Sequence, residues 1–198
     1  SNPKKNFKLG NNGAGYGAIA GNIKGGLGSA SIYVPELDIT VGAIAAVNSA
    51  GSLLIPGTKA FYAWDMELEN EFGGILPPEN FDKAIIAVPK HSSLHENTTL
   101  AVVATDANLT KSETRRLAII SQNGLSRAIR PSSTPLDGDI VFAISTGEKN
   151  IDDKVTKIGT LGAHAANCLG RSVARAVYEA ETLGKISSYQ DLQDNDEN

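Results

Sequence analysis

The sequence predicts a layered α/β fold, in which the strands of a sheet are covered by helices. Three features predict it: a pair of short β-branched runs near the start, a capped helix past the middle, and a long amphipathic helix near the end. Of the 198 residues, 41% are hydrophobic and 20% are charged, which is typical of an ordinary soluble domain with one core. We therefore treat residues 1–198 as a single domain.

The first predicted strands follow a glycine-rich segment, residues 10–28. Its small side chains cannot build a core, but they suit close approach of the backbone to another backbone or to a ligand. The runs 29–34 and 39–51 are short, apolar and β-branched, and the turn residues Pro35-Glu36-Leu37-Asp38 separate them. Two such runs with a turn between them predict an antiparallel pair.

A long connection is predicted next, over residues 56–96, which hold four prolines and an acidic run. One short strand is expected inside it, at 84–88. A connection of this length within a compact domain is typical of a functional or processed segment.

The second half of the chain predicts two strands and two helices. Residues 99–106 and 139–146 are apolar runs of strand length, which indicate strands covered on both faces. Thr110-Lys111-Ser112-Glu113 matches a capping box and predicts the start of a helix, which Arg130-Pro131 ends. Apolar residues recur at helical spacing from Leu161 to Ala180 and predict a long C-terminal helix.

Charge and hydropathy exclude several classes of partner. The net charge is −4, there is no basic stripe and aromatic residues are sparse, so nucleic-acid binding is not expected. No apolar run approaches the roughly 18 residues of a membrane span. The start, Ser1 to Leu9, is basic and polar and does not resemble a signal peptide, so we expect a cytoplasmic protein with no membrane partner.

No cofactor or metal is expected from the motifs. The glycine-rich segment contains no GxxxxGK[ST] phosphate loop. Asp137-Gly138-Asp139 is either a turn before a strand or part of a metal site, and two carboxylates without a nearby histidine favour the turn. Cys168 lies in an apolar helical pattern, which indicates a small buried side chain.

Thr98 is the candidate nucleophile, because a loop leads through it directly into an apolar strand. A threonine at the first residue of a strand, with its amine freed by cleavage after Asn97, is the architecture of N-terminal-nucleophile hydrolases. The hydroxyl attacks, and the α-amine, with an unperturbed pKa of ~7.7–8.0, serves as general base. No histidine is then required, and His91, His95 and His164 form no recognisable catalytic motif.

Four motifs occur in order: GAGYGAIAGNIKGGLGSAS, VGAIAAVNSAG, ENEFGG, and the run from Asn97 to Glu148 that begins NTTLAVVATD. Together they resemble the DmpA-type aminopeptidase family of L-aminopeptidase/D-esterases, β-peptidyl aminopeptidases and a nylon-oligomer hydrolase. The similarity extends from about Gly10 to Gly184. It implies an α/β/β/α sandwich like that of N-terminal-nucleophile hydrolases, and self-cleavage into residues 1–97 and 98–198.

The resemblance also implies roles for individual residues. Thr98 matches the nucleophile, and Asn97 matches the residue whose carbonyl is attacked during self-cleavage. Asn48 matches an asparagine that helps to hold the reacting carbonyl or the nucleophile. Asp137 and Asp139 match a pair of polar residues that would orient the new α-amine and tune its pKa.

The family's tyrosine or lysine near the glycine-rich segment has no direct match in this chain. Lys24 and Tyr16 are the available substitutes for its part in stabilising the oxyanion. The backbone around Gly25 and Gly26 is expected to contact the substrate.

The implied function is an aminopeptidase or amidase that hydrolyses small N-terminal residues from peptides, amides or esters through a threonine acyl-enzyme. The loop from Tyr62 to Gly74 is expected to hold the free ammonium of the substrate. Its acidic side chains are Asp65, Glu67, Glu69 and Glu71. The family further implies a homo-oligomer, usually a tetramer of processed protomers.

Two other functions stay open. Ornithine acetyltransferase shares this fold and a self-cleaving threonine, so acyl transfer is one alternative. The other is an inactive, truncated relative with a structural or binding role, because family members carry an N-terminal portion before the glycine-rich segment that this chain lacks.

Overall fold

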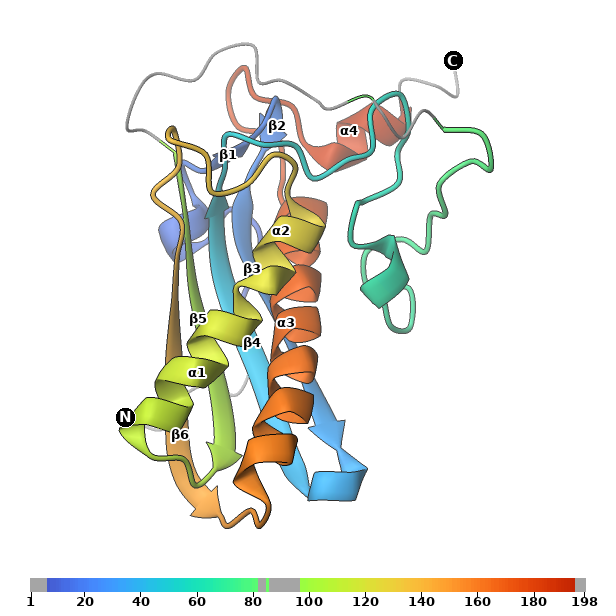
Figure 1. Cartoon of the computed structure of the whole chain (residues 1–198). Helices are drawn as coiled ribbons and strands as arrows, with labels where there is room; N and C mark the ends of the chain where they lie inside the picture. Colours follow the sequence, from blue (N-terminus) through green and yellow to red (C-terminus); the bar gives the residue numbers. More distant parts are fainter. Residues whose placement is uncertain (1–6, 82–84, 86–96, 195–198) are drawn as a thin grey trace.

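The computed structural model describes residues 7–81, 85 and 97–194. Its centre is a four-stranded sheet in the order β3-β4-β5-β6 (Figure 1). The strands are β3 (Gly26–Val34), β4 (Ile39–Asn48), β5 (Thr98–Ala107) and β6 (Ile140–Lys149). β4 pairs antiparallel with β3 and β5, whereas β5 and β6 are parallel. The predicted antiparallel pair of the first half is therefore confirmed.

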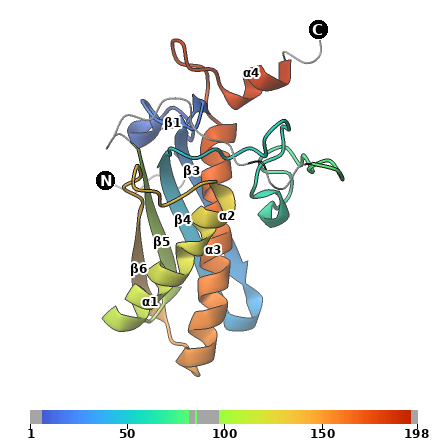
Figure 2. The ribbon, with the colours of Figure 1, turned by 45° about the horizontal axis from the view of Figure 1, so that its top comes forward.

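The helices cover one face of this sheet, as Figures 1 and 2 both show. The covering helices are α1 (Lys111–Ser121), α2 (Asn123–Ala128) and α3 (Lys154–Tyr178), whereas α4 (Tyr189–Asp194) lies beyond the end of the sheet. The short elements are β1 (Ile19–Ala20), β2 (Ile23–Lys24) and the 3-10 helices η1 (Gly13–Gly15), η2 (Pro35–Leu37) and η3 (Trp64–Met66). Among the described residues, none of the helices is long and apolar enough to cross a membrane.

The predicted capping box starts α1. The Thr110 side chain accepts a hydrogen bond from Glu113 N at 3.3 Å, and Glu113 Oε2 accepts one from Thr110 N at 2.7 Å. Both otherwise unpaired amides of the first turn are thus satisfied. The single helix predicted from here to Arg130 is in fact two, since α1 ends at Ser121 and α2 at Ala128.

The glycine-rich segment lets α3 lie directly on the sheet. A Cβ at Gly28 would stand 1.8 Å from Ser172 O, and one at Gly26 would stand 2.1 Å from Ala176 O. Real Cβ atoms do not approach this closely, so only glycine permits this contact between helix and strand. The sequence prediction of close backbone approach is confirmed here, with α3 as the partner.

The opposite face of the sheet is uncovered by the described residues. Leu100 on β5 is 48% exposed, and Phe142 and Ile144 on β6 are 53% and 51% exposed. The prediction that both strands are covered on both faces is therefore wrong for the described part of the chain. Apolar residues on both faces fit two covering layers, yet the described residues supply one helix layer.

The mixed α/β class is confirmed, and the four-stranded sheet and the helices on it form one sheet layer and one helix layer of an α/β/β/α arrangement; β1 and β2 form a separate two-stranded sheet. The strand predicted at 84–88 lies outside the described residues except for Ile85, which is in no strand.

Candidate active site

Thr98 and Asn48 meet at one end of the sheet. Thr98 is the first residue of β5, Asn48 is the last residue of β4, and the two are direct antiparallel partners. Successive side chains of a strand alternate between faces. Thr99 is fully buried under the helices, so Thr98 lies on the open face with Leu100. This end of the sheet is at the top of Figure 1.

The carbonyl oxygen of Asn97 accepts two hydrogen bonds. Thr98 Oγ1 donates one at 2.7 Å, and the backbone N–H of Gly138 donates the other at 2.9 Å. The hydroxyl of Thr98 therefore lies against the carbonyl of its own preceding peptide bond. A donor such as Gly138 N stabilises negative charge that develops on that oxygen when the carbonyl is attacked.

Gly138 is a site residue that the predicted turn Asp137-Gly138-Asp139 did not reveal. A Cβ at this position would lie 2.7 Å from Thr98 Oγ1 and 3.8 Å from Asn97 O. A side chain here would therefore collide with the hydroxyl. The available signal was its position between two candidate aspartates, since a glycine there permits a close backbone approach.

Asp137 joins two loops beside the start of β5. Its Oδ1 accepts a hydrogen bond from Ala50 N at 3.1 Å, and its Oδ2 accepts bonds from Thr134 N at 3.0 Å and Thr134 Oγ1 at 2.7 Å. Ala50 follows β4, whereas Asp137 leads into β6 and forms a parallel bridge with Asn97. The carboxylate thus fixes the end of β4 relative to the loop that carries Gly138.

Asp139 holds the backbone of the residue after Thr98. Its Oδ1 accepts a hydrogen bond from Thr99 N at 2.8 Å, and its Oδ2 accepts one from Ser133 N at 3.2 Å. Burial raises the pKa of the Asp139 carboxyl above its ordinary value, and the nearby charge of Asp137 raises it further. The Thr99 amide opposes both effects because it stabilises the ionised form.

The amide of Thr98 points toward β4. Thr99 N faces Asp139 on the β6 side, and successive amides of a strand point to opposite neighbours. The amine that cleavage would release from Thr98 therefore lies on the side of Asn48. Asp139 lies on the opposite side of β5, toward β6, whereas Asp137 binds Ala50 N just after β4. The two predicted aspartates therefore occupy different positions around Thr98.

Lys24 is buried and organises the glycine-rich loop. It is 1% exposed, and Nζ donates to the carbonyls of Gly15, Ala18 and Gly25 at 2.8–2.9 Å. Burial lowers the pKa of the ammonium. All three ammonium protons have carbonyl partners, so the group is committed to the loop and does not point to an oxyanion.

This loop in turn orients Asn48. Ile19 follows the residue whose carbonyl Lys24 binds, and Ile19 N donates to Asn48 Oδ1 at 2.9 Å. The structure brings Lys24 near Asn48 by this route. The other glycine-rich candidates differ: Tyr16 is 61% exposed, and a Cβ at Gly25 would stand 2.2 Å from Val47 O, so Gly25 serves packing against β4. Gly26 packs against α3, as described above.

The acidic loop residues expected to hold a substrate ammonium are engaged elsewhere. Glu71 binds Arg171 through two hydrogen bonds and lies 3.6 Å from Arg175, and both arginines are on α3. Glu67 accepts hydrogen bonds from Phe72 N and Gly74 N, and Asp65 pairs with Arg127. Glu69 is exposed. Glu71 and Asp65 thus anchor the loop to the helices, and Glu67 binds amides of the loop itself, beside α3 (Figure 1).

Two further titratable residues, Cys168 and His164, lie on α3. Cys168 is fully buried in α3, and burial raises the pKa of its thiol to about 11. His164 on α3 lies 3.9 Å from Glu36, and His91 and His95 are outside the described residues. The residues that the structure describes contain no group of three His, Cys, Asp or Glu side chains able to hold a metal.

The sequence profile named Peptidase family S58 matches residues 1–190 of this chain. A Mycobacterium tuberculosis protein named as an uncharacterised aminopeptidase is 38% identical over 197 residues, covering 93% of this chain and 56% of the relative. A Mycobacterium leprae protein of the same description is 40% identical over 191 residues, covering 91% and 52%. The chain spans about half the length of the curated relatives it matches.

Solved structures share the fold. The L-aminopeptidase D-Ala-esterase/amidase of Ochrobactrum anthropi, described as a variant of the Ntn hydrolase fold, superposes with a TM-score of 0.65 at 21% identity, over 95% of this chain and 52% of that one. A β-aminopeptidase of a Burkholderia species gives 0.65 at 21% identity, over 95% and 53%. The PH0078 protein of Pyrococcus horikoshii gives 0.64 at 25% identity, over 93% and 48%.

Proposed function

This chain belongs to peptidase family S58, and from that premise we propose that it is a self-processing aminopeptidase with Thr98 as its N-terminal nucleophile. The observation that carries the proposal is the contact at the Asn97 carbonyl, where Thr98 Oγ1 and Gly138 N both donate to one oxygen. The names of the relatives support the same class of reaction.

Self-cleavage would proceed by attack of Thr98 Oγ1 on the carbonyl carbon of Asn97. Gly138 N would hold the oxygen as it becomes negative. The C–N bond to Thr98 then breaks, its nitrogen takes up a proton, and an ester joins the Asn97 carbonyl to the Thr98 oxygen. Water hydrolyses the ester, leaving a carboxylate on Asn97 and a free amine on Thr98.

The processed enzyme would use the same hydroxyl on its substrate. The α-amine of Thr98 accepts the hydroxyl proton as Oγ1 attacks the substrate carbonyl, and the leaving amine departs with a proton. Water then resolves the acyl-enzyme. Asn48, whose Oδ1 accepts from Ile19 N, would donate through its amide nitrogen on the β4 side of the nucleophile.

Release of p-nitroaniline from small aminoacyl or β-aminoacyl anilides tests this function in the full-length natural protein. We expect hydrolysis of anilides with a free amine, little hydrolysis of N-acetylated versions, and none by Thr98→Ala. Intact anilides together with transfer of acetyl groups from acetylornithine to glutamate would replace this proposal with acyl transfer.

A further inference from the structure

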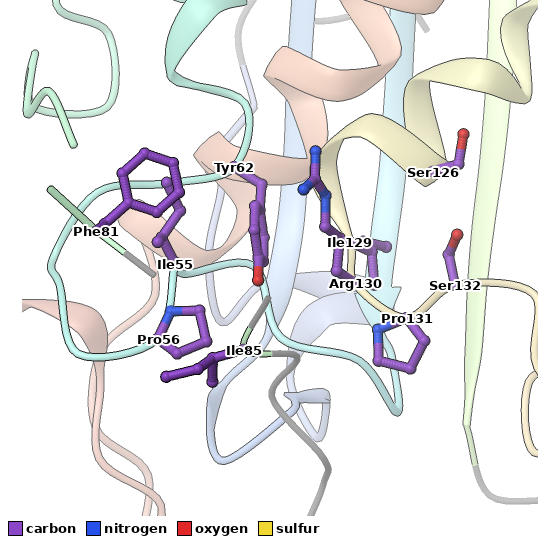
Figure 3. Close-up of a pocket in the computed structure, with 10 residues that line it drawn as sticks. All are labelled: Ile55, Pro56, Tyr62, Phe81, Ile85, Ser126, Ile129, Arg130, Pro131 and Ser132. Atoms are coloured by element: carbon purple, nitrogen blue, oxygen red, sulfur yellow. The ribbon is translucent and has the colours of Figure 1, made fainter. Parts of the chain in front are cut away.

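The loop that carries Gly138 runs from the end of α2 to the start of β6 and is held at both ends. At its start, Arg130 and Ser52 exchange backbone hydrogen bonds at 2.9 and 3.0 Å. The next residues, Pro131 and Ser132, form part of the wall of a pocket of about 490 Å3 where the chain leaves α2 (Figure 3). At its end, Gly138 N donates at 2.9 Å to the carbonyl oxygen that precedes β5. The position of this donor therefore depends on how the loop closes between its two ends.

Thr134 closes the loop just before Gly138. Its Oγ1 donates to Asp137 Oδ2 at 2.7 Å and accepts a hydrogen bond from Leu136 N at 3.2 Å. The backbone adds two bonds: Thr134 N donates to Asp137 Oδ2 at 3.0 Å, and Asp137 N donates to Thr134 O at 2.9 Å. Two of these four bonds depend on the hydroxyl, so a side chain without it would leave the turn half closed.

Asp137 connects this turn to both strands that flank β5. The residue that follows it, Gly138, supplies the amide donor on the β6 side. On the β4 side, Asp137 Oδ1 accepts a hydrogen bond from Ala50 N at 3.1 Å, and Ala50 lies two residues after Asn48. The hydroxyl of Thr134 thus bears on both sides of the candidate site through one carboxylate.

We propose that Thr134 is a positioning residue, whose hydroxyl holds Asp137 so that Gly138 N points at the reacting carbonyl oxygen. The proposal rests on the proposed function and adds a residue that acts in both self-cleavage and hydrolysis. A fixed donor stabilises the oxygen as it becomes negative, so an error in its position raises the barrier of both reactions. Because such a donor acts mainly on the transition state, its displacement is expected to lower kcat with little change in KM.

Thr134→Val tests the proposal in the full-length natural protein, because valine has nearly the same shape and lacks the hydroxyl. We expect the rate of self-cleavage to fall by about 10- to 100-fold, the range for one hydrogen bond to a charged group. In the fully cleaved protein, kcat for an aminoacyl anilide should fall by a similar factor, with KM within about twofold of the wild type. Thr134→Ser, which keeps the hydroxyl, should recover most of both rates. If Thr134→Val does not fold, Thr134→Ala removes the same hydroxyl without added bulk and should show the same losses.

Thr58→Val is the matched control. Thr58 Oγ1 also closes a turn, since it donates to Ile55 O at 2.9 Å and accepts from Ala60 N at 3.1 Å, but this turn lies in a different loop. The variant should cut itself and hydrolyse the anilide at wild-type rates. An equal loss in Thr58→Val would show that the effect is not specific to the turn before Gly138.

The remaining outcomes separate this proposal from the proposed function. Wild-type rates in Thr134→Val, a rise in KM at unchanged kcat, or no recovery in Thr134→Ser would overturn the role of Thr134 while leaving the aminopeptidase intact. A lower stability of Thr134→Val with wild-type rates in the folded protein would likewise make the turn purely structural. A wild-type protein that neither cuts itself nor hydrolyses the anilide would instead count against the proposed function.

Discussion

Gly138 is the residue whose size is most tightly limited at the site. Gly138→Ala would place a methyl group 2.7 Å from Thr98 Oγ1, so the hydroxyl or the loop that carries the amide donor must move. We expect self-cleavage to slow by about 10²–10³-fold, the cost of losing one oxyanion donor. A time course of the two fragments after purification measures this.

Gly159→Ala is the matched control, because a Cβ there meets no atom within 4 Å. This variant should be processed at the wild-type rate. Normal cleavage in Gly138→Ala, in protein whose thermal unfolding matches the wild type, would remove the amide of Gly138 from the mechanism.

Asp139 should make stability depend on pH. The folded state raises the pKa of this carboxyl, chiefly through burial, so the folded protein binds the proton more tightly than the unfolded chain does. Its stability contribution therefore falls as pH rises from the ordinary value of 3.8 through the raised value. Asp139→Asn can still accept from Thr99 N and should flatten that fall.

Denaturant unfolding at a series of acidic pH values measures the effect. Equal slopes of unfolding free energy against pH in Asp139→Asn and the wild type would show that another group causes the dependence.

At the scale of elements, the loop of residues 62–74 depends on α3. Arg171 is 8% exposed and Glu71 is 15% exposed at the side chain, so Glu71→Gln would leave a buried guanidinium without its anion. We expect a loss of about 3–5 kcal/mol in the free energy of unfolding. Asp65, in the same loop, forms an exposed ion pair with Arg127 on α2. Asp65→Asn breaks this pair and should lower the free energy of unfolding by less than about 1 kcal/mol.

Chemical denaturation of the two variants gives the comparison. Equal losses of unfolding free energy in the two variants would contradict the anchoring role of Glu71. An increase in KM of Glu71→Gln without a loss of stability would instead indicate that Glu71 binds substrate.

Local chemistry made some elements predictable. The capping box at Thr110 and Glu113 fixed the start of α1, and two β-branched runs around Pro35 fixed the β3–β4 pair, because these signals act over a few residues. The burial of β6 was not predictable in the same way. Apolar residues on both faces of a strand indicate two covering layers, but which chain segment supplies each layer is a tertiary property.

The same difference between local signals and tertiary contacts applies to the candidate site. A position at the start of a strand marked Thr98, and the resemblance supplied Asn48 and the two aspartates. The pairing of Glu71 with Arg171 joins residues 100 positions apart, so no local motif could predict it. The partners of Lys24 Nζ are carbonyls of the same glycine-rich segment, and they meet the ammonium only because of the way this segment folds. Gly138 was visible as a glycine, yet its contact with Thr98 arises from the parallel pairing of β5 and β6.

For the whole molecule, the main open question is what covers the face of the sheet that the described residues leave exposed. The chain spans about half of its curated relatives, and the resemblance implies a second sheet opposite this one. Phe142, half exposed here, would then be buried in the full-length protein. Phe142→Asp should lower the free energy of unfolding of that protein by about 3–5 kcal/mol, as expected for a buried aromatic.

Val155→Asp is the control, since Val155 is 90% exposed in the first turn of α3. It should change stability by no more than about 0.5 kcal/mol. Equal, small effects of both substitutions would show that the face stays open to solvent in the full-length protein.

Cleavage between Asn97 and Thr98 is the central claim, and the intact mass of the purified protein, followed by N-terminal sequencing, tests it most directly. We predict two pieces, one of which begins Thr-Thr-Leu-Ala, and a single uncut chain for Thr98→Ala. An active wild-type protein that remains one chain, or that is cut at another bond, would contradict the account.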